Sequence, residues 1–387
     1  MMPVYYENGY PSAGIEQGLN PAVMTTSASG DHNTKTKRAI TKVGFDIKAP
    51  WVEGLGMDGY FVYSNEDILD KRWRTPWTVY NYDKENDTYL PLRGGRITAP
   101  ELTQSTQSVS STFLNLRIKY ERQFGDHYIN SFVGAEQTKG GNGYYEAFRR
   151  NYLSSTLSEL FAGDPATQQN DGVSAESSRQ SILGRLSYNF QEKYIIDFNA
   201  RYDGSYVFPE GKRFGFFPGV SAAWVLSEEF FKERSGVNDL KLRASVGKMG
   251  NDRISPFQFM PAYSLGLNGY HFGSPTTSQL GVVPGVTPNP NVTWEVATTY
   301  NFGLDGMFWN GGLGFTVEVF KQRRTNILTK RNLEVPFYTG LQLPDENIGV
   351  VENKGLEIAL NHRGKPSAPG GLSYTVGGNI AFNKNKV

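Results

Sequence analysis

The sequence lacks cysteine, has only four histidines and contains no long hydrophobic run. Without thiols there is no disulfide bond, no thiolate nucleophile and no cysteine-ligated zinc site. The histidines, His32, His127, His271 and His362, have none of the spacings of metal-binding motifs. No apolar stretch approaches the ~18 residues of a membrane-spanning helix. A mean hydropathy of −0.46 is still compatible with a membrane β-barrel, whose strands alternate apolar and polar residues.

Net charge is nearly absent, because 39 basic residues oppose 38 acidic ones and leave a formal charge of +1. This balance argues against a nucleic-acid partner, since affinity for nucleic acids comes mainly from a basic surface. Aromatic residues and glycine are abundant, with 24 Phe, 22 Tyr, 6 Trp and 43 Gly. Such a composition favours strands joined by many turns.

Catalytic motifs are also missing. The glycines of 140–143 precede no Lys-Ser/Thr pair, and no G-x-S-x-G elbow is present. Carboxylates such as Glu228, Asp203 and Asp305 are more often solvated or lumen-facing charges than a glycosidic pair. Residues 345–347, Asp-Glu-Asn, lack the spacing of an EF-hand calcium loop. We therefore predict no enzyme, no catalytic or metal-binding residue and no cofactor.

Period-two alternation, which is typical of strands with two different faces, recurs along most of the chain. The clearest examples are 114–120 and 194–202, and others are 182–190, 240–246, 294–308, 313–319, 356–362 and 372–382. In a membrane barrel the rows Leu114/Leu116/Ile118 and Tyr194/Ile196/Phe198 would face lipid, and Arg117, Lys119, Asp197 and Arg201 would face a wet lumen.

The links between these strands alternate in length. Short ones lie at 50–56, 125–126, 191–192 and 310–311, and long ones lie at 65–110 (with its own hairpin near 77–90), 140–177, 250–291 and 329–353. A membrane barrel predicts this asymmetry because its periplasmic turns are short and its extracellular loops are long. A soluble β-sandwich predicts no such bias. We count about 12 spanning strands, and we expect residues 1–37 to be irregular and part of an extracellular loop.

Large aromatic side chains concentrate in two of the long loops. The candidate ligand contacts among them are Trp73, Trp77, Tyr80, Tyr82, Tyr263, Tyr270 and His271. Flat side chains among Asn, Gln and Asp suit a sugar-binding surface, because sugar C–H faces stack and hydroxyls form hydrogen bonds. The alternative is that these side chains pack the long loops against each other.

Several short motifs, in order and with matching spacing, resemble the barrel of SusC/RagA-type TonB-linked outer-membrane transporters. They include residues 184–190, 200–205, 213–224, 240–251, 294–305 and 347–357, and the resemblance spans residues 38–387. Its signature residues are Arg201, Asp203, Gly204, Pro218, Trp224, Gly250, Asn251, Trp294, Glu295, Gly303, Asp305, Asn353 and Gly355. We expect structural roles for them, such as close approaches at Gly303 and Gly355.

The resemblance implies an all-β protein, part of a large antiparallel transmembrane β-barrel with about 12 of about 22 strands and without the plug domain. It implies uptake of oligosaccharides or peptides, energised by TonB–ExbB–ExbD through a missing N-terminal part. It also implies a SusD-like surface lipoprotein as a partner. The alternative function is a soluble or surface-attached β-rich carbohydrate-binding protein.

Overall fold

The computed structural model describes residues 3–13, 18–95, 97–232, 236–266, 271–272, 277–278, 281–330, 342–364 and 372–387. Helices in these ranges are short: α1 (Pro21–Met24), α2 (Leu226–Phe230) and the 3-10 turns η1 (Ser27–Ser29), η2 (Leu160–Ala162) and η3 (Pro165–Thr167). None of the helices in the described part of the chain is long and apolar enough to span a membrane.

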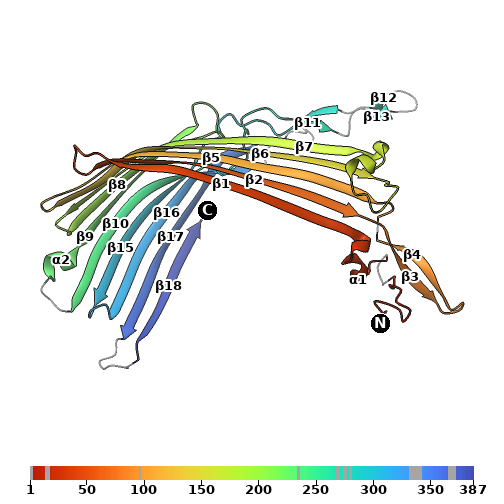
Figure 1. The fold of residues 1–387 in the computed structure, drawn as a ribbon. Helices are drawn as coiled ribbons and strands as arrows, with labels where there is room; N and C mark the ends of the chain where they lie inside the picture. Colours follow the sequence, from red (N-terminus) through yellow and green to blue (C-terminus); the bar gives the residue numbers. More distant parts are fainter. Residues whose placement is uncertain are drawn as a thin grey trace. The chain divides into compact units, whose positions relative to one another are not determined.

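Twelve strands form one sheet, in the order β1-β2-β5-β6-β7-β8-β9-β10-β15-β16-β17-β18 (Figure 1). Their bounds are β1 (Gly30–Lys48), β2 (Leu55–Arg74), β5 (Glu101–Phe124), β6 (His127–Arg150), β7 (Gln169–Phe190), β8 (Tyr194–Ser205), β9 (Phe214–Val225), β10 (Val237–Asn251), β15 (Glu295–Phe308), β16 (Leu313–Lys330), β17 (Asp345–Gly364) and β18 (Tyr374–Lys386). From β7 to β18 every neighbour pairs antiparallel. The predicted all-β class and the predicted count of strands are therefore confirmed. A β-sandwich would instead divide these strands between two packed sheets.

In the part of the chain that the structure describes, three small hairpins complete the strands. They are β3 (Trp77–Asp83) with β4 (Thr88–Gly94), β11 (Tyr263–Gly266) with β14 (Gly281–Pro284), and β12 (His271–Phe272) with β13 (Thr277–Ser278). The first confirms the hairpin predicted near 77–90.

The short links are tight turns that need left-handed backbone. Gln191 and Glu192, between β7 and β8, have φ of 54° and 57°. Asn310 and Gly311, between β15 and β16, have φ of 56° and 79°. Two central residues with positive φ define the hairpin turn that matches the twist of the flanking strands. The predicted hairpin at Asn310–Gly311 is confirmed.

Several strands run further than the sequence predicts. Residues 30–37, expected to be irregular, belong to β1, and parts of the expected loops belong to β2, β5, β6, β7 and β17 (65–74, 101–110, 140–150, 169–177 and 345–353). Residues 30–37 and 103–108 have no apolar side chain, so they show no apolar alternation. In other extensions the apolar residues are adjacent, as at Ile68–Leu69 and Tyr144–Tyr145, and so do not alternate. Period-two patterning detects a strand only where one of its faces is apolar.

The chain divides into two compact units. Unit 1 is Met1–Lys42, Val62–Phe113 and Lys139–Ser177, and unit 2 is Val43–Phe61, Leu114–Thr138 and Ser178–Val387. Unit 1 contains two small apolar clusters, one of Ala13, Val23, Trp77 and Val79 and one of Trp73, Leu102 and Tyr152. Unit 2 contains one, formed by Val207, Phe208, Phe217, Val292 and Trp294.

Candidate functional site

One face of the unit 2 sheet is apolar and exposed. We call it the apolar face, and its members, each more than a third exposed, are Leu114, Leu116, Ile118, Tyr194, Ile196, Phe198, Val220, Val246, Phe302, Val319, Leu360 and Ile380. Register keeps them together, since Phe198 pairs with Val220 and Val220 pairs with Val246. An apolar surface that continues over many strands is unfavourable in water and suits contact with lipid.

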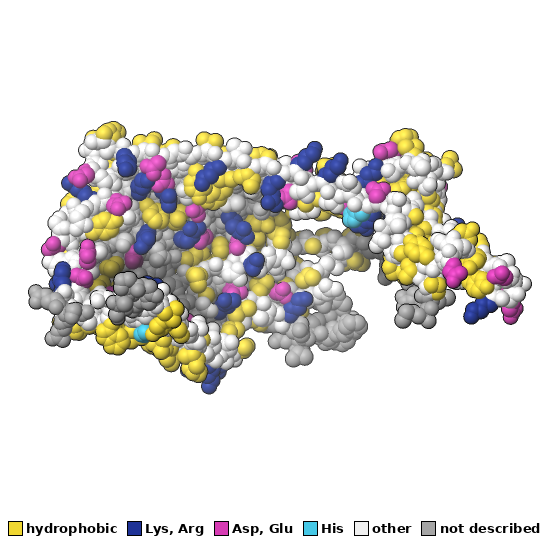
Figure 2. All heavy atoms as spheres, turned by 60° about the horizontal axis from the view of Figure 1, so that its bottom comes forward, with side chains coloured by type: hydrophobic (Ala, Val, Ile, Leu, Met, Phe, Trp, Pro, Cys, Tyr) yellow, Lys and Arg dark blue, Asp and Glu magenta, His cyan; other side chains and the backbone are white. Residues whose placement is uncertain are grey.

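The opposite face, the polar face, carries charges that pair with one another. Arg117 Nε donates to Asp58 Oδ1 at 2.9 Å, and Lys119 Nζ lies 3.2 Å from Asp58 Oδ2. Figure 2 shows one face of the molecule on which basic and acidic side chains lie next to one another. Because most of these carboxylates have basic neighbours, the polar face is hydrophilic without a strong local charge of either sign.

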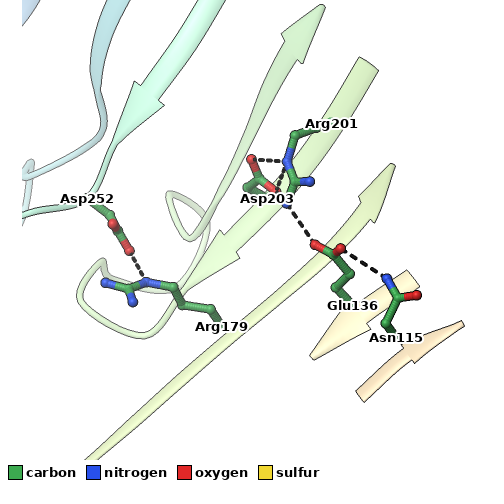
Figure 3. A network of polar contacts seen from close by, with 6 residues as sticks. All are labelled: Asn115, Glu136, Arg179, Arg201, Asp203 and Asp252. Carbon is green, nitrogen blue, oxygen red and sulfur yellow. Dashed lines mark hydrogen bonds and ion pairs between the residues drawn. The ribbon is translucent and has the colours of Figure 1, made fainter. Parts of the chain in front are cut away.

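Arg201 is the centre of a larger network on the polar face (Figure 3). Its Nη2 lies 3.0 Å from Asp203 Oδ1, two residues further along β8, and donates to Glu136 Oε2 of β6 at 3.2 Å. The other oxygen of Glu136 accepts from Asn115 Nδ2 at 3.0 Å. The signature pair Arg201 and Asp203 thus links β5, β6 and β8, which fits a role in holding the wall together.

A second network repeats this design on β10, β15 and β16. Arg243 Nε donates to Asp305 Oδ2 at 2.9 Å, and its Nη2 donates to Glu318 Oε1. Thr316 Oγ1 donates to Asp305 Oδ1 at 3.0 Å. The guanidinium lies over Gly303, where a Cβ would be 2.7 Å from Arg243 Cζ. The close approach predicted at Gly303 is therefore observed.

Other signature glycines also make room for bulky neighbours. A Cβ on Gly250 would lie 2.0 Å from the ring of Phe217, and one on Gly204 would lie 2.5 Å from the ring of Phe214. At Gly355 a Cβ would lie 2.5 Å from the amide of Asn383. Cross-strand packing of a large side chain over a glycine explains why these positions carry no side chain.

Two signature tryptophans pack at the ends of strands. Trp294 is buried against Phe208 and Phe217, and its Nε1 donates to the Arg213 carbonyl at 3.3 Å. Trp224 Nε1 donates to Glu229 at 2.5 Å. The remaining signature residues are in strands: Pro218 opposite Ala200, Asn251 opposite Glu295, Glu295 in an ion pair with Arg324 at 3.2 Å, and Asn353 opposite Gln322 and Asn385.

Two of the predicted ligand-contacting aromatics, Tyr80 and Tyr82, lie in a cluster of five tyrosines in unit 1. We call Tyr6, Tyr10, Tyr80, Tyr82 and Tyr89 the tyrosine cluster. Tyr10 stacks on Tyr80 with ring centroids 4.3 Å apart, and Tyr89 lies 5.0 Å from both Tyr6 and Tyr82. Tyr10 and Tyr82 are 43% and 39% exposed, so two of the rings present surface to solvent.

The tyrosine cluster is held by hydrogen bonds between the hairpin and the N-terminal segment. Tyr6 Oη donates to the Tyr80 carbonyl at 3.3 Å and accepts from the Tyr82 backbone N–H at 3.2 Å. Tyr82 Oη donates to Asp87 at 2.8 Å, and this bond raises the pKa of Tyr82. Sequence analysis missed Tyr6 and Tyr10, although three tyrosines within residues 5–10 were a signal for them.

Trp73 and Trp77 are buried in unit 1. Trp73 packs edge-on against Tyr152 at 4.7 Å, and its Nε1 donates to the Ser155 carbonyl at 3.2 Å. Trp77 lies against Val79 and over Gly94 and Gly95. These positions favour loop packing, the alternative that the sequence left open for them.

The other candidates belong to unit 2. Tyr263 is 69% exposed on the short hairpin strand β11. His271 begins β12, but its side chain and the whole of Tyr270 lie outside the described residues. Within the described residues no three His, Asp or Glu side chains gather as a metal site.

Comparison with known proteins identifies the class. The family described as "TonB dependent receptor-like, beta-barrel" matches residues 5–387, and the chain belongs to this family. It is therefore part of an outer-membrane barrel that crosses the membrane with strands. This settles the choice against a soluble β-rich protein.

Curated relatives are longer than this chain. TonB-dependent receptor P3 of Formosa agariphila is 26% identical over 371 residues, which cover 95% of this chain and 34% of the relative. TonB-dependent receptor SusC of Bacteroides thetaiotaomicron is 28% identical over 289 residues, which cover 73% of this chain and 28% of the relative. The chain spans about a third of the length of these relatives.

Solved structures of a peptide transporter share the fold. The RagAB peptide transporter superposes with a TM-score of 0.79 at 19% identity, covering 98% of this chain and 39% of that chain. The RagAB peptide importer in its "open-open" state gives 0.77. The chain therefore shares the architecture of a transporter barrel.

Proposed function

We propose that the protein containing this chain takes up oligosaccharides or peptides across the outer membrane in a TonB-dependent manner. The observation that carries the proposal is the tyrosine cluster, which lies beyond the long-loop ends of β2 and β5. In outer-membrane barrels the long loops are extracellular, so this cluster faces the side from which substrate arrives. Sugar faces and peptide side chains both stack on exposed aromatic rings.

The polar face supports the same proposal as the wall of a route for hydrophilic cargo. Its paired charges, such as Arg243 with Asp305, offer hydrogen-bonding groups without a strong net field. TonB–ExbB–ExbD would supply the energy, acting through a part of the protein outside this chain. A SusD-like surface lipoprotein would assist capture, in keeping with the likeness to SusC and RagAB.

The test uses the natural protein containing this chain, in its own outer membrane and in a strain that lacks the chromosomal copy. Uptake of fluorescent oligosaccharide and peptide pools is measured with and without a protonophore, which removes the energy that TonB transmits. We expect uptake of one pool that the protonophore abolishes. Equal uptake of both pools in the strain with and without the gene would contradict the proposal.

A variant pair tests the role of the tyrosine cluster. Tyr80→Ala with Tyr82→Ala removes one stacked ring and one exposed ring, so we expect the KM for uptake to rise about tenfold with little change in the maximal rate. Tyr82→Phe keeps the ring and is the matched control. Surface labelling of the protein confirms that the variants reach the membrane in equal amounts.

A further inference from the structure

Strand register places basic side chains in rows on the apolar face of unit 2. Lys321 of β16 pairs with Lys354 of β17, which pairs with Lys384 of β18. In the next row Arg323 pairs with Glu352, and Glu352 pairs with Lys386. We call Lys321, Arg323, Lys354, Lys384 and Lys386 the basic band.

The basic band borders the apolar face directly. Val319, Leu356 and Phe382 lie two residues from Lys321, Lys354 and Lys384 on the same three strands. They also pair with one another across these strands. Residues two apart in a strand point to the same side. The lysines therefore belong to the side that meets lipid.

The depth of the basic band in the membrane follows from the number of residues that separate it from the short-turn ends of its strands. Lys321 is the ninth residue of β16 counted from Leu313. Lys384 is the eleventh residue of β18 counted from Tyr374, and Lys354 is the eleventh of β17 counted back from Gly364. A tilted strand needs about 9–11 residues to cross the bilayer. Since short turns are periplasmic, the band lies where the strands leave the outer leaflet.

Within the described residues of this chain, most of this charge has no carboxylate paired with it. Glu352 pairs with Lys321 at 3.0 Å. Within the described residues neither Lys354 nor Lys384 has a carboxylate at ion-pair distance, although they lie directly opposite each other. Like charges facing each other across strands are destabilising, so an external anion would stabilise this arrangement.

An apolar groove ends at the band. It has a volume of about 570 Å³, its lining includes Ala244, Tyr300, Phe302 and Val319, and Lys321 and Lys354 stand at one side of it. Tyr300, Phe302 and Val319 are each about half exposed. The groove thus combines a surface for hydrocarbon with ammonium groups at its border.

We infer that the basic band and this groove bind one phosphorylated lipid of the outer leaflet. The lysines and Arg323 donate charge-assisted hydrogen bonds to the phosphate groups, and one acyl chain lies along Phe302 and Val319. The site depends on the membrane-spanning sheet and is independent of the cargo that the protein takes up.

Native mass spectrometry of the full-length natural protein in mild detergent tests this inference. Bisphosphorylated lipid A is added as the probe, with dioleoylphosphatidylcholine as the zwitterionic comparison. We expect the double variant K354Q/K384Q to bind the probe about thirtyfold more weakly, since each basic group near an anionic lipid surface contributes about fivefold. K354R/K384R, which keeps both charges, should bind as the natural protein does.

Two controls make the outcome decisive. Lys232→Gln removes an exposed lysine near the short turns, which pairs with Glu228 at 3.3 Å, and should leave lipid binding unchanged. A heat-modifiability assay on gels shows that each variant is folded. Equal lipid A binding by K354Q/K384Q, or equally tight binding of phosphatidylcholine, would overturn the inference. Displacement of the lipid by millimolar inorganic phosphate alone would show a free-anion site and would overturn it as well.

Discussion

At the scale of single residues, several glycines of the sheet, such as Gly204, Gly250 and Gly303, are positions where a neighbouring side chain occupies the space of a Cβ. Gly250 is among the tightest, because the ring of Phe217 lies 2.0 Å from the place of its Cβ. Phe217 in turn packs against Trp294 at 5.2 Å. A methyl group at position 250 would therefore disturb the apolar cluster of unit 2 as well as the strand.

We expect Gly250→Ala to lower the free energy of unfolding by about 1–3 kcal/mol, the usual cost of overpacking. Urea unfolding of the detergent-folded protein, followed by tryptophan fluorescence, measures it. Gly247→Ala, on the same strand and with its new Cβ 3.8 Å from the Gly219 Cα, is the control and should change little. If the double variant Gly250→Ala/Phe217→Leu recovers the lost stability, the Phe217 ring is the cause. An unchanged midpoint of urea unfolding in Gly250→Ala would contradict the prediction.

A second feature of single residues is the hydrogen bond that Tyr82 Oη donates to Asp87. Because it raises the pKa of Tyr82, the folded hairpin favours the protonated phenol. Its contribution to stability is complete below the ordinary pKa of about 10 and is lost as the pH rises through the raised pKa. We expect Asp87→Asn to shift one tyrosine titration to lower pH at 295 nm. The titration curve of Tyr82→Phe, subtracted from that of the natural protein, shows which titration belongs to Tyr82. Identical titration curves for Asp87→Asn and the natural protein would refute the prediction.

At the scale of elements, the sequence predicts strands well where one face meets lipid. The alternation at 194–202 lies within β8, and the tight turns at 191–192 and 310–311 are at the predicted positions. Residues 30–37 and 103–108 escaped prediction because neither stretch has an apolar side chain to alternate with its polar ones. The burial of Trp73 depends on Tyr152, which is 79 positions away, and no local pattern predicts such a contact.

The candidate site was also only partly predictable from the sequence. Tyr80 and Tyr82 were predictable from their density in a long loop, but their partners Tyr6 and Tyr10 come from a segment expected to be irregular. The pairing of Ser12 with Tyr80 brings that segment to the hairpin. Long-range pairing of this kind follows from tertiary structure rather than from spacing along the chain.

At the scale of the whole molecule, one face of the sheet requires apolar side chains and the other accepts charged ones. Ile196 belongs to the apolar face and Ser187 to the polar face, where it lies opposite Asp197. A charge near the middle of the lipid-facing surface costs about 2–4 kcal/mol, whereas a charge on the lumen side is hydrated.

We therefore expect Ile196→Lys to reduce the amount of folded protein in the outer membrane severalfold and to lower its stability by about 2–4 kcal/mol. Ser187→Lys, on the neighbouring strand, should assemble normally. Quantitative blotting of outer-membrane fractions, followed by urea unfolding, compares the two. Equal assembly of both variants would mean that the apolar face does not meet lipid.

The length of β5 and β6 has a consequence for whatever approaches the cell from outside. β5 and β6 have 24 residues each, while about 9–11 are enough to cross the membrane. At roughly 3.3 Å per residue, about 45 Å of each strand's length remains beyond the bilayer. An antibody, a bacteriophage tail or a protease would therefore meet hydrogen-bonded sheet over much of this surface. Accessible epitopes and cleavage sites should concentrate in the long connections that follow β2 and β6.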